Sequence, residues 1–108
     1  YQQVGVFAEA SHYKQVKAKS LKGLAEIDRL QGQLEAALPR HRQAILLLEE
    51  IGAKCDLADA HYQLGLTVHQ LDRQQQALDH FAQATRLFRD IGAPRQVERV
   101  EGSASVSQ

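Results

Sequence analysis

Little in the composition of this 108-residue chain points to chemistry. There is one cysteine, Cys55, so the chain can form no internal disulfide and has no cysteine-rich zinc pattern. Methionine and tryptophan are absent, and aromatic residues make up only 6% of the chain. A single thiol agrees with a reducing compartment, and we expect a cytoplasmic protein. Because the chain starts at Tyr1 and holds no methionine, we expect it to be a piece of a longer protein.

Excess charge and long apolar runs are also missing. Lysine and arginine total 13, and aspartate and glutamate also total 13, so the net charge is zero with histidine neutral. A neutral chain gives no electrostatic reason to expect nucleic acid or an anionic membrane surface as a partner. No apolar run approaches the roughly 18 residues that a membrane-spanning helix needs. We therefore expect neither a nucleic acid nor a membrane partner.

Catalytic and metal-binding patterns are lacking as well. The sequence contains no glycine-rich phosphate loop and no Gly-x-Ser-x-Gly motif. Among the five histidines, His61 and His69 are eight residues apart and His80 stands farther on, which is not the spacing of a zinc site. We expect these histidines to be solvated or half-packed, with no metal, no cofactor and no enzymatic activity. A metal- or thiol-dependent activity through Cys55 and the histidines is the weakest alternative.

What the sequence does contain is apolar residues at helical spacing. Two such sets stand on either side of the polar run at residues 72–75, and Gly92 follows the second. Steps of three and four residues place each set on one face of an α-helix. The first set is Leu57, Leu64, Val68 and Leu71, and the second is Ala77, Phe81, Ala84, Phe88 and Ile91. The spacing predicts a pair of helices that needs similar neighbours to bury both faces.

The chain supplies such a neighbour through an internal repeat of 40 residues. Residues 32–53 and 72–93 are identical at eight of 22 positions, where composition alone would give roughly one or two. The identities include alanines where helices approach closely and a glycine that ends each second helix. The shared positions are Ala37/Ala77, Leu38/Leu78, Gln43/Gln83, Ala44/Ala84, Leu47/Leu87, Ile51/Ile91, Gly52/Gly92 and Ala53/Ala93. A repeat of this length built from helix pairs predicts an all-α fold, an α-solenoid.

These residues resemble the tetratricopeptide repeat. The second unit reads Leu64-Gly65, Ala77, Phe81 and Ala84, which fits that family's pattern in type and spacing. The first unit is a weaker match: it reads Leu24-Ala25, Gly32, Ala37, His41 and Ala44, and Asp28 stands where an apolar residue is usual. The 40-residue period resembles a longer-helix subtype found in signalling and scaffold proteins. The resemblance implies a protein- or peptide-binding scaffold segment of a larger, bacterial, signalling or regulatory protein.

The repeat sets the expected boundaries. We expect the tail of a preceding second helix at residues 1–11, with a turn at Ser11 and His12, then repeat one at 13–52 and repeat two at 54–92. Helices are expected at 13–31, 54–71 and 74–91, and Pro39 either follows a late helix start near Ala36 or lies in a mildly kinked first turn. Ile27 and Leu30 fall one residue early relative to Val68 and Leu71, which suggests a small register shift or a longer turn in the first pair. A capping helix is expected at 94–101 and a disordered tail at 102–108.

Two interaction surfaces follow from this arrangement. The first helices of the pairs should line a groove, and the resemblance points to the same positions as ligand contacts: Lys22, Glu26, Arg29, Tyr62, Leu66 and His69. Tyr62 and Leu66 would form an apolar shelf with a charged rim. It is equally open that these two residues pack against a neighbouring helix. The alternative function is homodimerisation, in which the open N-terminal end buries Tyr1, Val4 and Phe7 against a second copy.

Overall fold

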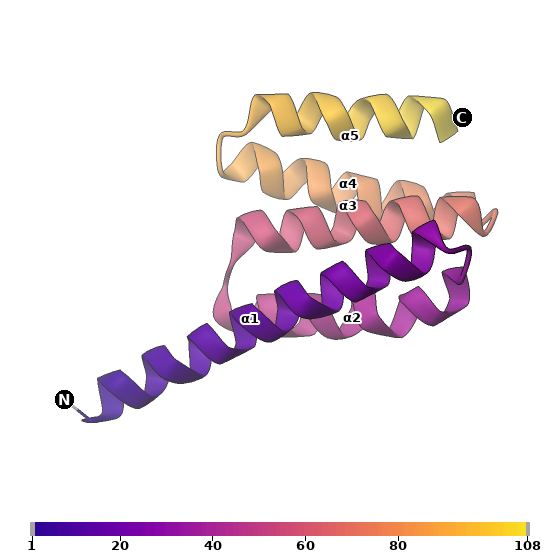
Figure 1. Cartoon of the computed structure of the whole chain (residues 1–108). Coiled ribbons are helices and arrows are strands. Elements are labelled where there is room, and N and C mark those ends of the chain that lie inside the picture. Colours follow the sequence, from indigo (N-terminus) through magenta and orange to yellow (C-terminus); the bar gives the residue numbers. More distant parts are fainter. Residues whose placement is uncertain (1, 108) are drawn as a thin grey trace.

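The described backbone, residues 2–107, forms five α-helices (Figure 1). The computed structural model describes the backbone of residues 2–107 and the side chains of residues 10–104. The helices are α1 (Gln2–Leu30), α2 (Leu34–Ile51), α3 (Lys54–Gln70), α4 (Gln74–Asp90) and α5 (Pro94–Ser107). Each helix packs against the next one along the chain. The predicted all-α solenoid of antiparallel helix pairs is confirmed.

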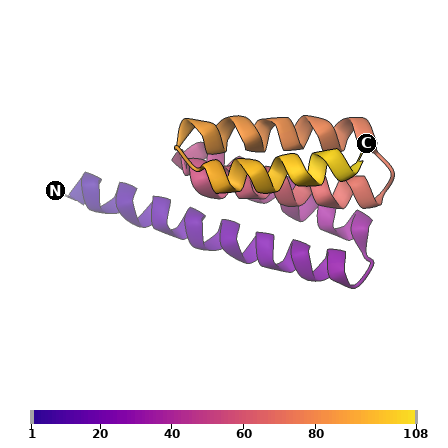
Figure 2. The ribbon, with the colours of Figure 1, turned by 90° about the horizontal axis from the view of Figure 1, so that it is seen from above.

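The helices repeat with the period that the sequence predicts. The end of α1 at Leu30 and the end of α3 at Gln70 are 40 residues apart, as are the starts of α2 at Leu34 and α4 at Gln74. The stack is elongated, with principal extents of 52 × 31 × 18 Å. Seen from above, α1 projects past the other helices at its N-terminal end (Figure 2). Pro39 lies inside α2, which begins at Leu34 and not near Ala36.

The four turns share one backbone device. In each turn a single residue adopts a left-handed conformation, with φ of +80° at Gly32, +69° at Gly52, +60° at Asp72 and +72° at Gly92. The next amide then reaches back to the helix, as when the Ala53 N–H donates to the Leu48 carbonyl at 3.1 Å. This Schellman arrangement satisfies carbonyls that the helix end leaves unpaired. Asp72 adopts the left-handed conformation without being glycine, which only short polar side chains do readily.

The core depends on small residues where paired helices meet. Ala37, Ala44, Ala77 and Ala84 are all fully buried. The approach is tight in the second pair, where a Cβ added to Gly65 would lie 2.6 Å from Cε1 of Phe81. At the equivalent positions of the first pair stand Ala25 and His41, which are both fully buried. The smaller imidazole ring allows the alanine, whereas the phenyl ring requires the glycine.

Two expected boundaries are wrong. No turn occurs at Ser11 and His12, because α1 continues unbroken from Gln2 to Leu30 and no proline interrupts it. The tail expected to be disordered is helical as far as Ser107. Contacts with the body explain this helix: Glu101 pairs with Arg89 at 2.8 Å, and the Ser103 hydroxyl lies 2.9 Å from that of Tyr62.

The expected register shift in the first pair is also wrong. Asp28 occupies the position of Val68 and is only 7% exposed, whereas Ile27 and Leu30 are exposed. The buried carboxylate is tolerated because Arg40 on α2 donates to it at 2.7 Å. Leu24 stands at the position equivalent to Leu64, but it is 45% exposed, whereas Leu64 is 2% exposed.

The contact between Gly65 and Phe81 yields the first prediction. Gly65→Ala should lower the free energy of unfolding by about 1–3 kcal/mol, because the new methyl group overpacks the phenyl ring. Gly23→Ala is the matched control: it lies in α1 with nothing within 4 Å, and should raise stability by about 0.5–1 kcal/mol. Urea denaturation of both variants measures these changes. Equal stabilisation by both substitutions would show that the approach is not tight.

Candidate functional site

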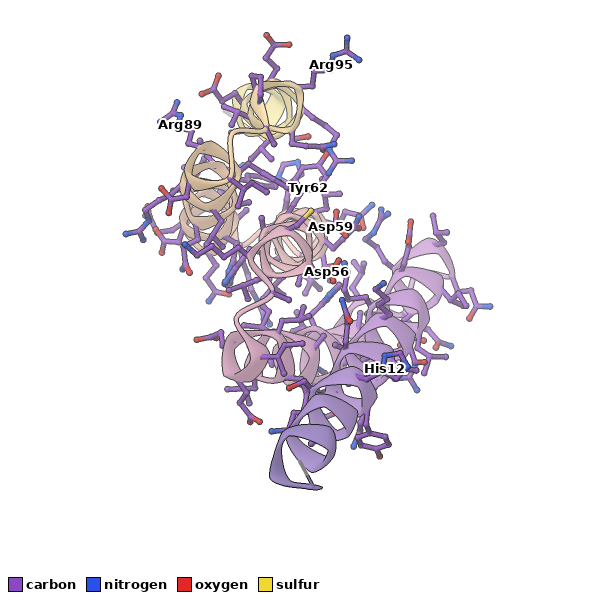
Figure 3. All side chains as sticks on the ribbon, turned by 90° about the vertical axis from the view of Figure 1, so that its left-hand side faces the viewer. His12, Asp56, Asp59, Tyr62, Arg89 and Arg95 are labelled. Carbon is purple, nitrogen blue, oxygen red and sulfur yellow. The ribbon has the colours of Figure 1, made fainter. Side chains whose placement is uncertain are left out.

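Alternate helices form one side of the stack. Viewed along the helices, α1, α3 and α5 lie on one side, while α2 and α4 lie on the other (Figure 3). We call the first side the α1–α3–α5 face. It is defined by Lys22, Glu26 and Arg29 of α1, by Asp59, Gln63 and Leu66 of α3, and by Arg99 of α5. The three helices therefore bring side chains about 40 residues apart in sequence onto a shared surface.

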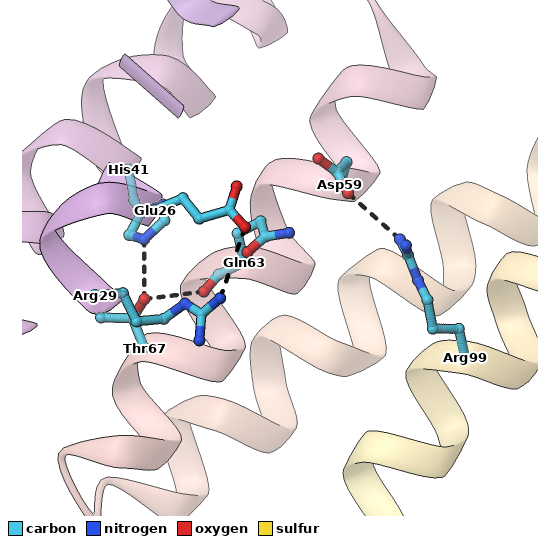
Figure 4. Close-up of polar contacts among 7 residues, drawn as sticks. All are labelled: Glu26, Arg29, His41, Asp59, Gln63, Thr67 and Arg99. Carbon is cyan, nitrogen blue, oxygen red and sulfur yellow. Dashed lines mark hydrogen bonds and ion pairs between the residues drawn. The ribbon is translucent and has the colours of Figure 1, made fainter. Parts of the chain in front are cut away.

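A carboxylate at the centre of this face joins all three helices. One oxygen of Asp59 lies 2.7 Å from the Lys22 ammonium group. The other lies 3.4 Å from the Arg99 guanidinium group (Figure 4). The side chain of Lys22 is mostly covered, and that of Arg99 is 45% exposed. A shared carboxylate of this kind fixes the relative position of neighbouring helices, and the partial exposure of Arg99 leaves a cation accessible to solvent.

Glu26, Arg29 and Gln63 lie beside this row. The Arg29 guanidinium group is 3.9 Å from the Glu26 carboxylate, which is a loose ion pair between residues three apart on one helix. The side chain of Glu26 is exposed, whereas that of Arg29 is mostly covered. Arg29 Nε and Gln63 Oε1 are buried and have no hydrogen-bond partner among the described residues. Glu26 is thus the most accessible charge that α1 adds to the face.

The expected apolar shelf is wrong for Tyr62, which is 8% exposed. Helix α5 covers it: Arg99 lies 4.6 Å above the centre of the phenol ring, and the two hydroxyls of Tyr62 and Ser103 are 2.9 Å apart. The ring of Phe81 also packs against Tyr62, with 5.9 Å between the two ring centres. Tyr62 instead packs against a neighbouring helix, which is the alternative that the sequence left open. Arg99 lies in the capping helix that the sequence predicts at 94–101, whereas Ser103 lies in the part that it predicts to be disordered.

The remaining predicted residues are partly accessible. Leu66 is half-buried and packs against the core, and His69 is half-buried near the end of α3 with its Nδ1 unpaired among the described side chains. The structure adds Asp59 and Arg99, which sequence reasoning missed. Their signal was present, because they occupy equivalent positions 40 residues apart and carry opposite charges. The side chains of Tyr1, Val4 and Phe7 lie outside the described residues, so their role in self-association stays a prediction.

His41 is a buried part of the core. Its Nε2 lies 3.0 Å from the Thr67 hydroxyl, and that hydroxyl donates to the Gln63 carbonyl at 3.1 Å (Figure 4). Since the hydroxyl hydrogen is used, His41 donates from Nε2 and keeps Nδ1 unprotonated. Burial, with the charges of Arg29 and His80, lowers the pKa of His41 to about 4. The imidazole is therefore neutral at pH 7.

His61 and His80 form a pair that the sequence spacing did not reveal. Their Nδ1 atoms are 3.2 Å apart, and their ring centres are 5.5 Å apart. The second distance equals the first plus one ring radius for each imidazole, so both nitrogens lie on the line between the ring centres. The two nitrogens thus face each other along one line and share one proton. Burial and the neighbouring His80 lower the pKa of His61 to about 4, and burial also lowers the pKa of His80.

This histidine geometry suits a hydrogen bond rather than a metal. A zinc ion in line between the nitrogens would need about 4 Å, from two bonds of about 2 Å each. Within the described side chains, no group of three or more histidine, cysteine, aspartate or glutamate residues could hold a metal ion.

Cys55 is exposed. None of the described helices is both long enough and apolar enough to cross a bilayer.

A stack of antiparallel helix pairs with a polar face across its first helices defines a helical-repeat protein, a class that serves as a scaffold for protein interactions. Comparison with known families refines this assignment. The family model described as tetratricopeptide repeat matches residues 16–90, which is more than half of the chain. The chain therefore belongs to the tetratricopeptide repeat family. No curated protein and no solved structure matches it.

The buried histidines predict a pH-dependent stability. The pKa of His41 is about 4 in the folded chain, against 6.5 for a histidine exposed to water, so the unfolded state binds more protons between these values. The contribution of neutral His41 to the free energy of unfolding should be fully present above pH 6.5. It should fall by on the order of 3 kcal/mol as the pH drops towards 4. In His41→Gln this loss should be smaller. Urea denaturation over a pH series from neutral to acid tests it; parallel curves for both proteins would contradict the assignment.

Proposed function

We propose that the α1–α3–α5 face binds a segment of a partner protein, within a larger signalling or regulatory protein. The observation that carries the proposal is the row formed by Lys22, Asp59 and Arg99, whose charges alternate across three neighbouring helices. Alternating charges recognise a ligand by register and reject ligands with like charges opposite each position. Family membership supports a protein as the ligand.

The dimensions favour a short extended segment. Packed helices are about 8–10 Å apart, so the row from α1 to α5 spans roughly 16–20 Å. An extended chain advances about 3.3 Å per residue, so about six residues cross the face. Leu66, which is half-buried beside the row, offers an apolar contact, and Glu26 adds an exposed carboxylate at the edge. The face therefore offers charged contacts along the row and an apolar contact beside it.

Arg99 is the residue best placed to contact a ligand carboxylate. It is held by a long 3.4 Å contact to Asp59 and by the face of the Tyr62 ring, and it is 45% exposed. A ligand carboxylate can therefore bind the guanidinium group from the solvent side without displacing Asp59. Lys22 is held more tightly, at 2.7 Å, and acts mainly by fixing the Asp59 carboxylate.

The test uses peptides selected from a random display library on the whole chain. Lys22→Gln with Arg99→Gln should weaken a selected peptide about ten-fold, because the accessible Arg99 cation and the Lys22 that fixes Asp59 are worth roughly 1.4 kcal/mol together. The matched control, Arg42→Gln with Arg86→Gln, removes two exposed cations from α2 and α4 and should leave binding within about two-fold. Fluorescence anisotropy measures both. Equal losses in the two variants, or a library that yields no binder, would remove the α1–α3–α5 face as the site.

A specific observation favours self-association as a second function. Helix α1 exposes a stripe of apolar side chains at helical spacing: Tyr13 at 64%, Val16 at 50%, Leu24 at 45% and Ile27 at 50%. An apolar patch of this kind is a common contact surface between protein chains. The stripe extends the predicted N-terminal interface to residues that the structure describes.

If this stripe pairs two copies, the mass from light scattering should rise towards that of a dimer over a hundredfold increase in concentration. Leu24→Glu with Ile27→Glu should keep the chain monomeric, because two carboxylates would then be buried at the contact. These side chains are half exposed in the single chain, so folding should be little changed. A wild-type chain that stays monomeric at every concentration would exclude the interface.

A further inference from the structure

A second open surface lies between α4 and α5, away from the row of charges. It is a groove of about 530 Å³, which we call the α4–α5 groove. Leu78, Phe81 and Ala82 of α4 and Ala104 of α5 form its apolar floor, and Glu101 lies at its rim in an ion pair with Arg89. Nothing in the described part of the chain fills this groove.

The internal repeat places an equivalent groove 40 residues earlier, between α2 and α3. There Leu38, His41 and Leu64 stand where Leu78, Phe81 and Ala104 stand in the second unit, and they are 4%, 0% and 2% exposed. In the second unit Leu78 and Ala104 are only half-buried. The floor is thus covered in the first unit, whereas in the second Phe81 is buried and Leu78 and Ala104 remain partly exposed.

Helix α4 is the element that covers the earlier groove. Its His80 hydrogen-bonds to His61 of α3, and its Gln83 and Leu87 lie with Leu57 of α3 around a remaining gap of about 280 Å³. These three α4 residues are three and four positions apart, so they form one helical face. Since α4 covers the first groove in this way, the second groove has the shape to take a helix of the same kind.

The charges at the groove specify the occupant further. Glu101 stands at the position equivalent to His61, whose partner in the covered groove is His80. Glu101 already pairs with Arg89. A carboxylate can pair with two cations, as Asp59 does with Lys22 and Arg99, so Glu101 can also receive a cation on the incoming helix where α4 carries His80. The geometry points to the α4–α5 groove as a docking site for an amphipathic helix of a partner protein, with a basic residue facing Glu101 and an apolar residue seven positions later.

The probe is a labelled synthetic peptide with the sequence of residues 73–91 of this chain, carrying His80→Lys. It should bind the full chain in the micromolar range by fluorescence anisotropy, since part of its affinity is lost to helix formation in the short peptide. Ala82→Glu places a charge on the groove wall and should weaken binding at least about ten-fold. Ala36→Glu, at an exposed alanine of α2, is the matched control and should leave binding unchanged.

A charge exchange tests the partner chemistry independently of folding. The wild-type chain should bind the peptide with His80→Lys about three-fold more tightly than a peptide with His80→Glu, as expected for one partly exposed ion pair. In a chain carrying Glu101→Lys the order of the two peptides should reverse. A preference that does not reverse would overturn the assignment of Glu101.

Other results would overturn the docking site itself. Failure of the peptide to bind would remove an α4-like helix as the occupant. Binding that Ala82→Glu leaves unchanged would mean that the peptide displaces the chain's own α4, because Ala82 leaves with that helix. Self-association that Ala82→Glu abolishes, without peptide binding, would make a second copy the occupant. These results concern the α4–α5 groove alone, and binding on the α1–α3–α5 face would stand or fall separately.

Discussion

The close approach of two helices within each pair is the constraint on which the remaining structure depends. Phe81 lies so near the backbone of α3 that only a glycine fits at position 65. Once this contact is fixed, the alanines at 77 and 84 must be small, since they lie along the same tight interface. The first pair meets the same constraint differently, with a buried imidazole and Ala25. Because the two pairs satisfy the same constraint with different residues, the two units are more alike in backbone geometry than in sequence.

The first pair accepts polar groups that the second pair does not need. Asp28 stands at the position equivalent to Val68 and forms an ion pair with Arg40. His41 stands at the position equivalent to Phe81 and is hydrogen-bonded to Thr67. Each polar group retains a partner, so the desolvation that accompanies burial is partly offset. The backbone periodicity survives because the Schellman turns, and not the side chains of the core, set where each helix ends. The repeat is therefore a property of turn geometry first and of core composition second.

The same separation explains what the sequence could predict. The 40-residue offset, the helices at 54–70 and 74–90 and the left-handed glycines at 52 and 92 could all be predicted, because they depend on local periodicity and backbone preference. The burial of Tyr62 could not, because it depends on how α5 packs against α3. Arg99 lies in a predicted helix and Ser103 in a predicted disordered tail, but the contact of either residue with Tyr62 depends on that packing. The pairing of His61 with His80 was hidden for a related reason: two helices at a fixed distance bring together residues 19 positions apart. Contacts between helices require the packing itself.

The alternation of helices separates the two candidate surfaces physically. First helices present charged side chains at one side of the stack, and this side remains polar because Asp59 and its two cations satisfy one another there. The α4–α5 groove has an apolar floor because it repeats a surface that belongs to the core in the preceding unit. A ligand on the first surface would be recognised by charge and would weaken with salt. A helix in the second would be held mainly by apolar contact.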